Sequence, residues 1–87
     1  MTGTSGTIGT TVNSTGTSTA TCPATKVLLG GGYTLSNTTS SNYRDITVIV
    51  NRATTAGVAG VWTATGVNNN GGTSSNTTIV AYVVCTP

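Results

Sequence analysis

Residues 77–85 carry the strongest hydrophobic pattern in the chain. β-Branched and aromatic residues dominate this run, and Gly and Pro are absent from it, a composition typical of a strand. Alternation places two apolar sets on opposite faces, Ile79, Ala81, Val83 and Cys85 on one and Val80, Tyr82 and Val84 on the other. Because both faces are apolar, we expect a central strand, or one whose outer face meets another subunit.

Two further strands are predicted by alternation upstream of this run. In residues 44–52, Ile46, Val48 and Val50 share one face. In residues 61–68, Trp62 and Ala64 oppose a face made of Val61, Thr63, Thr65 and Val67. The sequence Asn-Asn-Asn-Gly-Gly at 68–72 favours a turn. We therefore expect residues 61–68 and 77–85 to form a hairpin.

A glycine triplet at 30–32 interrupts a short apolar run at 26–29, which we expect to be a buried strand. Three glycines within a strand pattern indicate a bulge, a sharp bend or close backbone contact. A phosphate-binding loop is the alternative, but the required glycine spacing is missing and no helical pattern follows.

Residues 1–21 are almost entirely Thr, Ser and Gly, a composition also typical of a disordered linker. Alternation nevertheless predicts one or two strands between about residues 6 and 21, with a turn near 13–16. Ile8, Thr10 and Val12 would share a face of the first strand. A row of hydroxyls, Thr15, Thr17, Thr19 and Thr21, would share a face of the next.

No part of the chain shows a helical period, so we predict an all-β fold. The expected architecture is a small antiparallel β-sandwich, jelly-roll-like or Ig-like, with about six or seven strands. Residues 1–21 would form an N-terminal strand extension, donated to a neighbouring subunit. Residues 22–87 would form a disulfide-closed β-sandwich domain.

Charge is nearly absent from these 87 residues. The charged side chains are Lys26, Arg44, Asp45 and Arg52, or 5% of the chain, where a soluble domain has about a quarter. A net charge of +2 is too small and scattered for binding nucleic acid. The apolar run at 79–85 is too short to span a bilayer as a helix. A hydroxyl and amide surface pairs readily with itself, so the expected partners are copies of this chain.

Cys22 and Cys85 are the two cysteines. In a small, charge-poor domain they predict one disulfide and an oxidising compartment, with two buried thiols as the alternative. Whether the bond would lie within one chain or between chains stays open. The first residues lack the pattern of a secretory signal. We therefore expect an extracellular or cell-surface protein that is a mature or excised segment, or a virion protein released at lysis.

The residues needed for catalysis are missing. There is no His and no Glu, and Asp45 is the one carboxylate side chain, so a paired-carboxylate mechanism is impossible. No base is present to activate a hydroxyl or thiol as a nucleophile. Two cysteines alone do not complete a transition-metal site. We predict a non-enzymatic protein without a metal or cofactor.

Four aromatic residues offer a candidate glycan site: Tyr33, Tyr43, Trp62 and Tyr82. Rings can stack on sugar faces, and Tyr43 and Trp62 are the candidate contacts. The favoured alternative is that Trp62 and Tyr82 fill the core or a subunit contact.

Two further binding patterns involve threonine and asparagine. A flat hydroxyl array would suit ice binding, but the sequence offers one clear row plus Thr63 and Thr65, where an ice binder should repeat the array over several strands. N-glycosylation sequons begin at Asn13, Asn37 and Asn76, and such matches arise readily by chance in a Thr-rich chain.

The order C-P-A-T-x-V-L-L-G-G-G-Y, then V-W-T-A-T-G-V-N-N, then A-Y-V-V-C resembles a cysteine-bracketed "GGGY" β-module of bacterial secreted and surface proteins and some phage structural proteins. The resemblance runs from Cys22 to Cys85. It implies an all-β module whose first and last strands are joined through these cysteines, and it implies no activity. Ala53 stands where the module leads us to expect proline.

The leading hypothesis is a structural subunit that self-assembles into an extracellular filament, tube or shell. Residues 1–21 would add a strand to a neighbour, with Ile8 and Val12 in apolar slots. The outer face of residues 77–85, with Val80, Tyr82 and Val84, would complete the interface. Alternatively the extension folds back on its own sheet. The other functional hypotheses are a phage virion protein, such as a capsid decoration or tail-fibre module, and a glycan- or surface-binding module.

Overall fold

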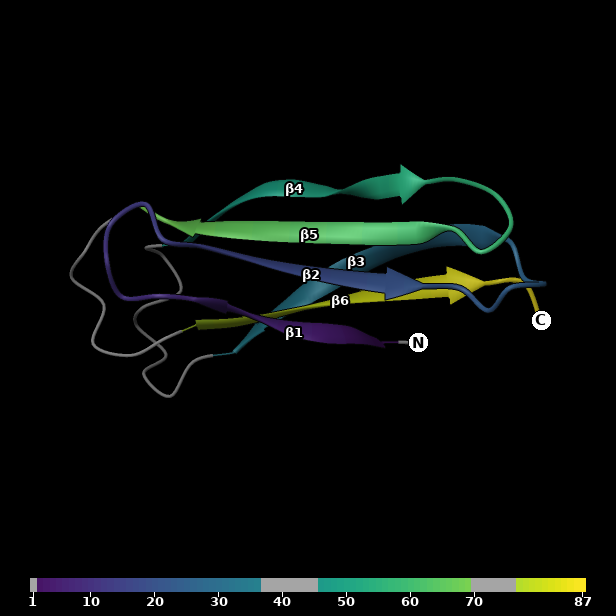
Figure 1. Cartoon of the computed structure of the whole chain (residues 1–87), viewed down its shortest axis with the longest axis horizontal. Helices are drawn as coiled ribbons and strands as arrows, with labels where there is room; N and C mark the ends of the chain where they lie inside the picture. The colour runs from purple at the N-terminus through teal and green to yellow at the C-terminus, as the bar shows by residue number, and fades with distance from the viewer. Residues whose placement is uncertain (1, 37–45, 70–76) are drawn as a thin grey trace.

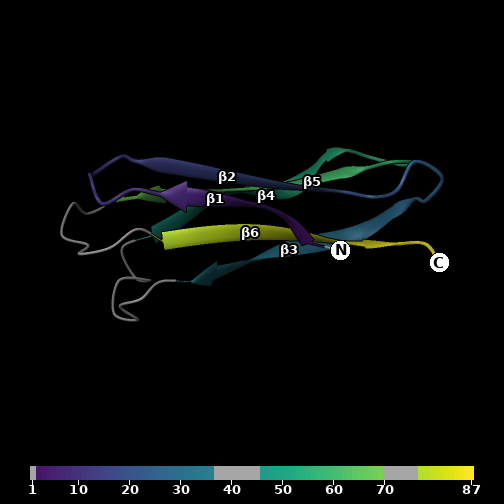
Figure 2. The same ribbon diagram turned by 60° about the horizontal axis from the view of Figure 1, so that its bottom comes forward.

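The computed structural model describes residues 2–36, 46–69 and 77–87, and they form an all-β sandwich. Six antiparallel strands make two three-stranded sheets that pack face to face (Figures 1 and 2). The strands are β1 (Thr2–Ile8), β2 (Thr15–Thr21), β3 (Leu28–Ser36), β4 (Ile46–Thr55), β5 (Val61–Asn68) and β6 (Thr77–Cys85). The predicted fold class is confirmed.

The first sheet has the order β1-β6-β3, and the second has the order β2-β5-β4. The strand β6 is therefore central, as its sequence predicts. The predicted hairpin between 61–68 and 77–85 is wrong, because β5 pairs with β2 and β4 while β6 lies in the other sheet. The polar N-terminal strands take the place of this hairpin, because β1 occupies one edge of β6 and β2 occupies one edge of β5.

The core lies between β1, β2, β5 and β6 and consists mainly of small side chains. Its buried apolar residues are Ile8, Ala20, Cys22, Ala64, Ile79, Ala81 and Val83. On the side where β1 faces β2 the two backbones come very close. A Cβ atom on Gly16 would lie 2.6 Å from the carbonyl carbon of Thr7. Glycine is therefore required here by lack of space.

The outer face of β6 is not covered by any other described part of the chain. Tyr82 is 40% exposed and Val84 is 52% exposed, while Val80 is half-buried. Part of the Tyr82 ring lies across the adjacent strand, where a Cβ atom on Gly32 would meet it. A tyrosine that fills the space above a glycine in this way stabilises an otherwise bare strand.

Two bulges change the faces that simple alternation predicts. In β4 the register shifts between Val48 and Val50, so that Val48 lies opposite Gly66 and Val50 opposite Thr65. Val50 therefore does not share the face of Val48, contrary to the predicted pattern, because a bulge adds one residue to one strand.

In β3 the register shifts between Leu28 and Gly30, which places a bulge at the start of the glycine triplet. The strand expected to begin within 26–29 begins at Leu28, which packs against the core. Its expected burial is wrong for the neighbouring residues, since Val27 is 36% exposed and Leu29 is 64% exposed.

A disulfide joins Cys22, which follows β2, to Cys85 of β6. It links the two sheets at one end of the sandwich and confirms the predicted bond. Its partners are 63 residues apart in sequence. In the chain-entropy model a loop of this size contributes on the order of 4 kcal/mol to stability. Such a contribution matters in a chain whose core contains so few large side chains.

Gly16 and Gly30 provide a matched test of the close packing between the sheets. We expect Gly16→Ala to lower the free energy of unfolding by about 1–3 kcal/mol, because the added methyl overlaps the backbone of Thr7. Gly30→Ala is the control, since nothing lies within 4 Å of its Cβ position. Urea unfolding measures both. Equal stability of the two variants would contradict the close approach of β1 and β2.

Candidate assembly surfaces

The N-terminal extension lies on its own chain in the structure. The strand β1 runs along one edge of β6, with Gly6 opposite Ile79 and Ile8 opposite Thr77. Ile8 is fully buried between the sheets. In the single chain the extension therefore folds back on its own sheet. Donation to a neighbour would use the same edge of β6 in another copy, and it stays a prediction.

Ser18 of β2 links the second sheet to β1 and β6 of the first sheet, at an irregular point of the β1 edge. It is 1% exposed, and its Oγ accepts a hydrogen bond from the Ala81 amide at 2.8 Å and donates one to the Thr4 carbonyl. The register between β1 and β6 shifts between Thr2 and Ser5. A side chain from the opposite sheet therefore satisfies backbone groups at the bulge.

The sequence does not reveal this role of Ser18. Alternation does place Ser18 on the inner face with Gly16 and Ala20, opposite the threonine row. A hydroxyl among small inward residues indicates a buried hydrogen bond, but its partners depend on long-range pairing.

Residues 9–14 connect β1 to β2 and are held by Asn68. The Asn68 amide side chain donates to the Gly9 carbonyl at 2.9 Å, and its backbone N–H donates to the Ser14 carbonyl at 2.9 Å. Asn13 donates to the Asn68 carbonyl at 2.7 Å. Its φ of 69° lies in the left-handed region that asparagine tolerates. The connection is therefore a defined turn that must open if β1 is to move.

The position of this turn shows that the prediction of Ile8 and Val12 on one face of the same strand is wrong. The strand β1 ends at Ile8, so Val12 lies in the connection and is 48% exposed. The turn falls at 10–13, earlier than the predicted 13–16. The reason is that Asn68 bonds to residues at both ends of the connection. Asn13 is exposed, while the sequons at Asn37 and Asn76 lie outside the described residues.

The candidate glycan residue Trp62 does not present an open ring. It faces the space between the sheets, where its ring would meet a Cβ atom on Gly31. Its indole N–H donates to Asn51 Oδ1 at 2.9 Å. A ring for sugar stacking is better sought at Tyr82 on the outer face, or at Tyr43, which lies outside the described residues.

The threonine row of β2 continues onto β5 and β4. Thr17 lies opposite Thr65 and Thr19 lies opposite Thr63. The side-chain oxygens of Thr17 and Thr65 are 2.9 Å apart, and those of Thr54 and Thr63 are 2.7 Å apart. All four residues of the β2 row are exposed. The outer surface of the second sheet, which we call the hydroxyl face, thus carries threonine hydroxyls on three strands, together with Val50 and Arg52 of β4, which lie opposite Thr65 and Thr63. The sequence showed only one clear row of it.

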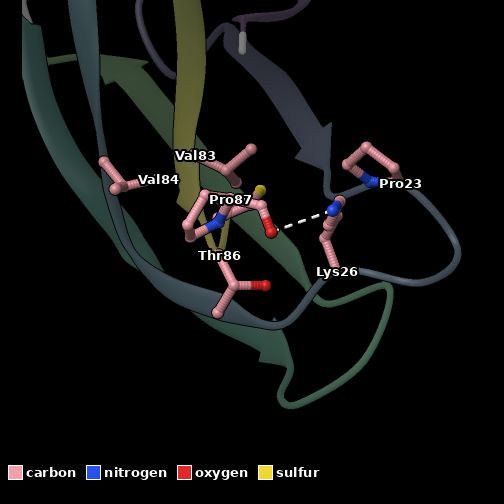
Figure 3. Close-up of a pocket in the computed structure, with 7 residues that line it drawn as sticks. Pro23, Lys26, Val83, Val84, Thr86 and Pro87 are labelled. Carbon is pink, nitrogen blue, oxygen red and sulfur yellow. Dashed lines mark hydrogen bonds between the residues drawn. The ribbon is translucent and has the colours of Figure 1, made fainter.

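A shallow pocket lies near the disulfide and the C-terminal residues (Figure 3). It is lined by Pro23, Lys26, Val83, Val84, Cys85, Thr86 and Pro87. The charged group in this lining, the Lys26 ammonium, donates a hydrogen bond to the Pro87 backbone oxygen at 2.9 Å. We assign no ligand to this pocket.

Within the described ranges, no three His, Cys, Asp or Glu side chains gather where they could hold a metal ion. No helix in that same part of the chain is long and apolar enough to cross a membrane.

Comparison of the chain with protein-family models, with curated proteins and with solved structures found no match. The resemblance to the "GGGY" module therefore stays a prediction.

Ser18→Ala tests how β1 is held. The change removes the partner of the Ala81 amide and of the Thr4 carbonyl, which should cost about 1–3 kcal/mol of unfolding free energy. We expect faster hydrogen exchange of the β1 amides and little change in β4. Ser5→Ala is the control, because Ser5 is an exposed serine on the same strand. Equal hydrogen-exchange rates of the β1 amides in Ser18→Ala and in wild type would contradict the role of Ser18 in holding β1.

Proposed function

We propose that the protein is a non-enzymatic structural subunit that self-assembles outside the cell into a filament, tube or shell by exchanging β1 between neighbours. The observation that carries the proposal is the position of β1. It is an edge strand, it is anchored by the buried Ile8, and it lies upstream of the disulfide loop that begins at Cys22. The strand can therefore leave its own β6 while the disulfide stays intact.

Exchange of an identical strand has a low energetic cost. A neighbour's β1 would make the same backbone hydrogen bonds with β6 and bury the same Ile8 side chain. The differences are the opening of the turn at 9–14 and the entropy of joining two chains. Reciprocal exchange closes a dimer, whereas exchange from each subunit to the next stays open and makes a fibre.

The surface chemistry favours a protein that exists in an assembled form. Arg52 is the one charged residue within the six described strands. Few charges leave little repulsion between copies. The disulfide is compatible with an oxidising compartment, and we propose an extracellular or cell-surface location, with a virion as the alternative. Electron microscopy distinguishes open filaments from a closed virion component of fixed stoichiometry.

Truncation with peptide complementation tests strand exchange. We expect the chain without residues 1–13 to remain non-assembled and less stable, because the edge of β6 has lost β1 and Ile8. A peptide of residues 1–13 should bind this chain, restore its stability and yield monomers. Added in excess to the full chain, it should shorten the assemblies seen by electron microscopy.

The control for this experiment is the same peptide with Ile8→Asp, which should not bind because it would bury a carboxylate. Full-length chain that remains monomeric at every concentration would refute the proposed function. Assembly that persists unchanged without residues 1–13 would refute strand exchange as its mechanism.

The hydroxyl face supports a second candidate function, ice binding. Alternate residues on a strand are about 6.8 Å apart and neighbouring strands about 4.8 Å apart. Paired threonines on β2, β5 and β4 therefore hold hydroxyls in a two-dimensional array, as the contacts of Thr17 with Thr65 and of Thr54 with Thr63 illustrate. An ice surface is likewise a regular array of oxygen atoms.

Ice-recrystallisation inhibition tests this second function. Wild-type protein should inhibit crystal growth, and Thr19→Lys should lose most of that activity because it removes a hydroxyl from the middle of the β2 row. Thr7→Lys is the control, since Thr7 is an exposed threonine on β1 in the other sheet. Absence of inhibition by the wild type, or equal loss in both variants, would rule out this assignment.

A further inference from the structure

The two long sides of the sandwich are packed differently. On the side of β1 and β2 the backbones touch at glycines, and the inward-facing Ile8 is fully buried. On the side of β3 and β4 the large inward-facing side chains remain partly exposed. This group consists of Leu28, Tyr33, Leu35, Ile46 and Trp62. Among the residues that the structure describes, the apolar interior is therefore closed along one side and open along the other, which we call the β3/β4 seam.

The strand β3 also has a backbone edge suited to pairing. From Gly30 to Ser36 it keeps a regular register with β6 on one side. On its other side the described sheet ends, except near Leu28, whose N–H bonds to the Gly57 carbonyl. Strand β3 contains neither proline nor a charged residue, and its one bulge lies at its start, between Leu28 and Gly30. Proteins that remain monomeric usually protect such an edge with charges, proline or bulges.

The edge of β4, by comparison, is less regular. It has two register shifts and carries Arg52. A partner is therefore expected to form its hydrogen bonds with β3 and to pack side chains against β4.

We propose that the β3/β4 seam is an interface with a second copy of this chain, in which β3 pairs antiparallel with β3 of the partner about a two-fold axis. This inference rests on the proposed function and names a contact in addition to strand exchange. A two-fold axis brings identical edges together in the antiparallel direction. The β1-β6-β3 sheet would then continue from one copy into the other, while β4 would contact the partner through side chains.

A second copy fits the seam better than a single peptide does. A peptide could pair with β3, but the side chains between β3 and β4 would stay partly exposed. A second sandwich presents its own seam, so Trp62 and Tyr33 of both copies become covered in one contact. The long side of the molecule measures 43 Å by 15–20 Å, which is of the size that gives roughly 800 Å² per partner in a stable complex.

Strand order places this interface opposite the exchanging strand. In the first sheet β1 and β3 lie on the two sides of β6. A subunit that exchanges β1 on one side and pairs through β3 on the other has two separate contacts. Two such contacts per subunit are enough to propagate a linear assembly.

Trp62 provides a reporter specific to the seam, because it is the single tryptophan of the chain. The oxidised full-length chain is examined over a concentration series by analytical ultracentrifugation, together with acrylamide quenching of its fluorescence. We expect quenching to fall as association proceeds. Exchange of β1 rebuilds the same contacts within each sandwich and leaves Trp62 as accessible as before.

The test variant carries Leu29→Lys and Ile49→Lys, which place charges on β3 and β4 at residues that are 64% and 58% exposed. These lysines add like charges to both copies at the contact and supply no counter-charge, which should raise the dissociation constant by about tenfold or more. Val12→Lys is the control, because Val12 is a similarly exposed residue in the β1–β2 connection, outside the seam.

Each outcome separates the two proposals. Association without protection of Trp62 overturns the seam and leaves strand exchange standing. Protection of Trp62 that persists in the double variant also overturns the seam. Protection that is lost in the double variant and kept in Val12→Lys supports the seam, even if the peptide experiment refutes strand exchange.

Should the double variant fail to fold, hydrogen exchange at residues 30–36 of the wild type decides between association through the seam and its absence. Equal protection at low and high concentration refutes the seam.

Discussion

The close approach of β1 to β2 is the constraint on which the rest of the structure depends. A chain with 5% aromatic residues and no phenylalanine has little side-chain volume to fill the space between two sheets. The sheets must therefore come together until backbone meets backbone, which glycine permits at Gly16 and Gly6. Packing at this distance leaves room for small residues such as Ala20 and Ala81, and for one hydroxyl, that of Ser18.

That constraint explains why the N-terminal extension belongs to the fold. Without β1, one edge of β6 would have no strand partner, and Ile79 would lose the cover of Ile8. Without β2, the edge of β5 and the link to Cys22 would be lost as well. In a domain this small, edge strands and a disulfide replace the contribution that a larger core would make. The extension is therefore structural even though its composition is typical of a linker.

The sequence predicts much of the local structure because alternation and cysteine number are local features. The all-β class, the central position of β6, the two faces of β5 and the bond between Cys22 and Cys85 follow from them. The predicted hairpin between β5 and β6 failed because a turn sequence shows that the chain reverses, not which sheet it returns to. The predicted face of Val50 failed because one extra residue at a bulge reverses the alternation that follows it. The predicted burial of Leu29 failed because Leu29 is itself the extra residue between Leu28 and Gly30.

The candidate sites were harder to predict because they depend on long-range register. The partners of Ser18, the position of Val12 outside β1 and the pairing of Thr17 with Thr65 join segments that are distant in sequence. One residue of slip in any strand would have separated them. Sequence patterns can show which residues share a face of one strand, but they do not show which strand lies alongside.

The unequal sides of the sandwich connect this architecture to assembly. The pairing of an exposed strand edge with another chain costs little free energy. A protein that stays monomeric therefore needs a feature that prevents such pairing. Strand β4 has two register shifts and a charge, whereas β3 has one bulge, at its start, and no charge, and its register is regular from Gly30 to Ser36. The same strand borders the part of the interior that stays partly exposed. Within the described residues, a weakly protected edge therefore coincides with the part of the core that is least covered, and this coincidence is the basis on which we propose that another copy completes the surface.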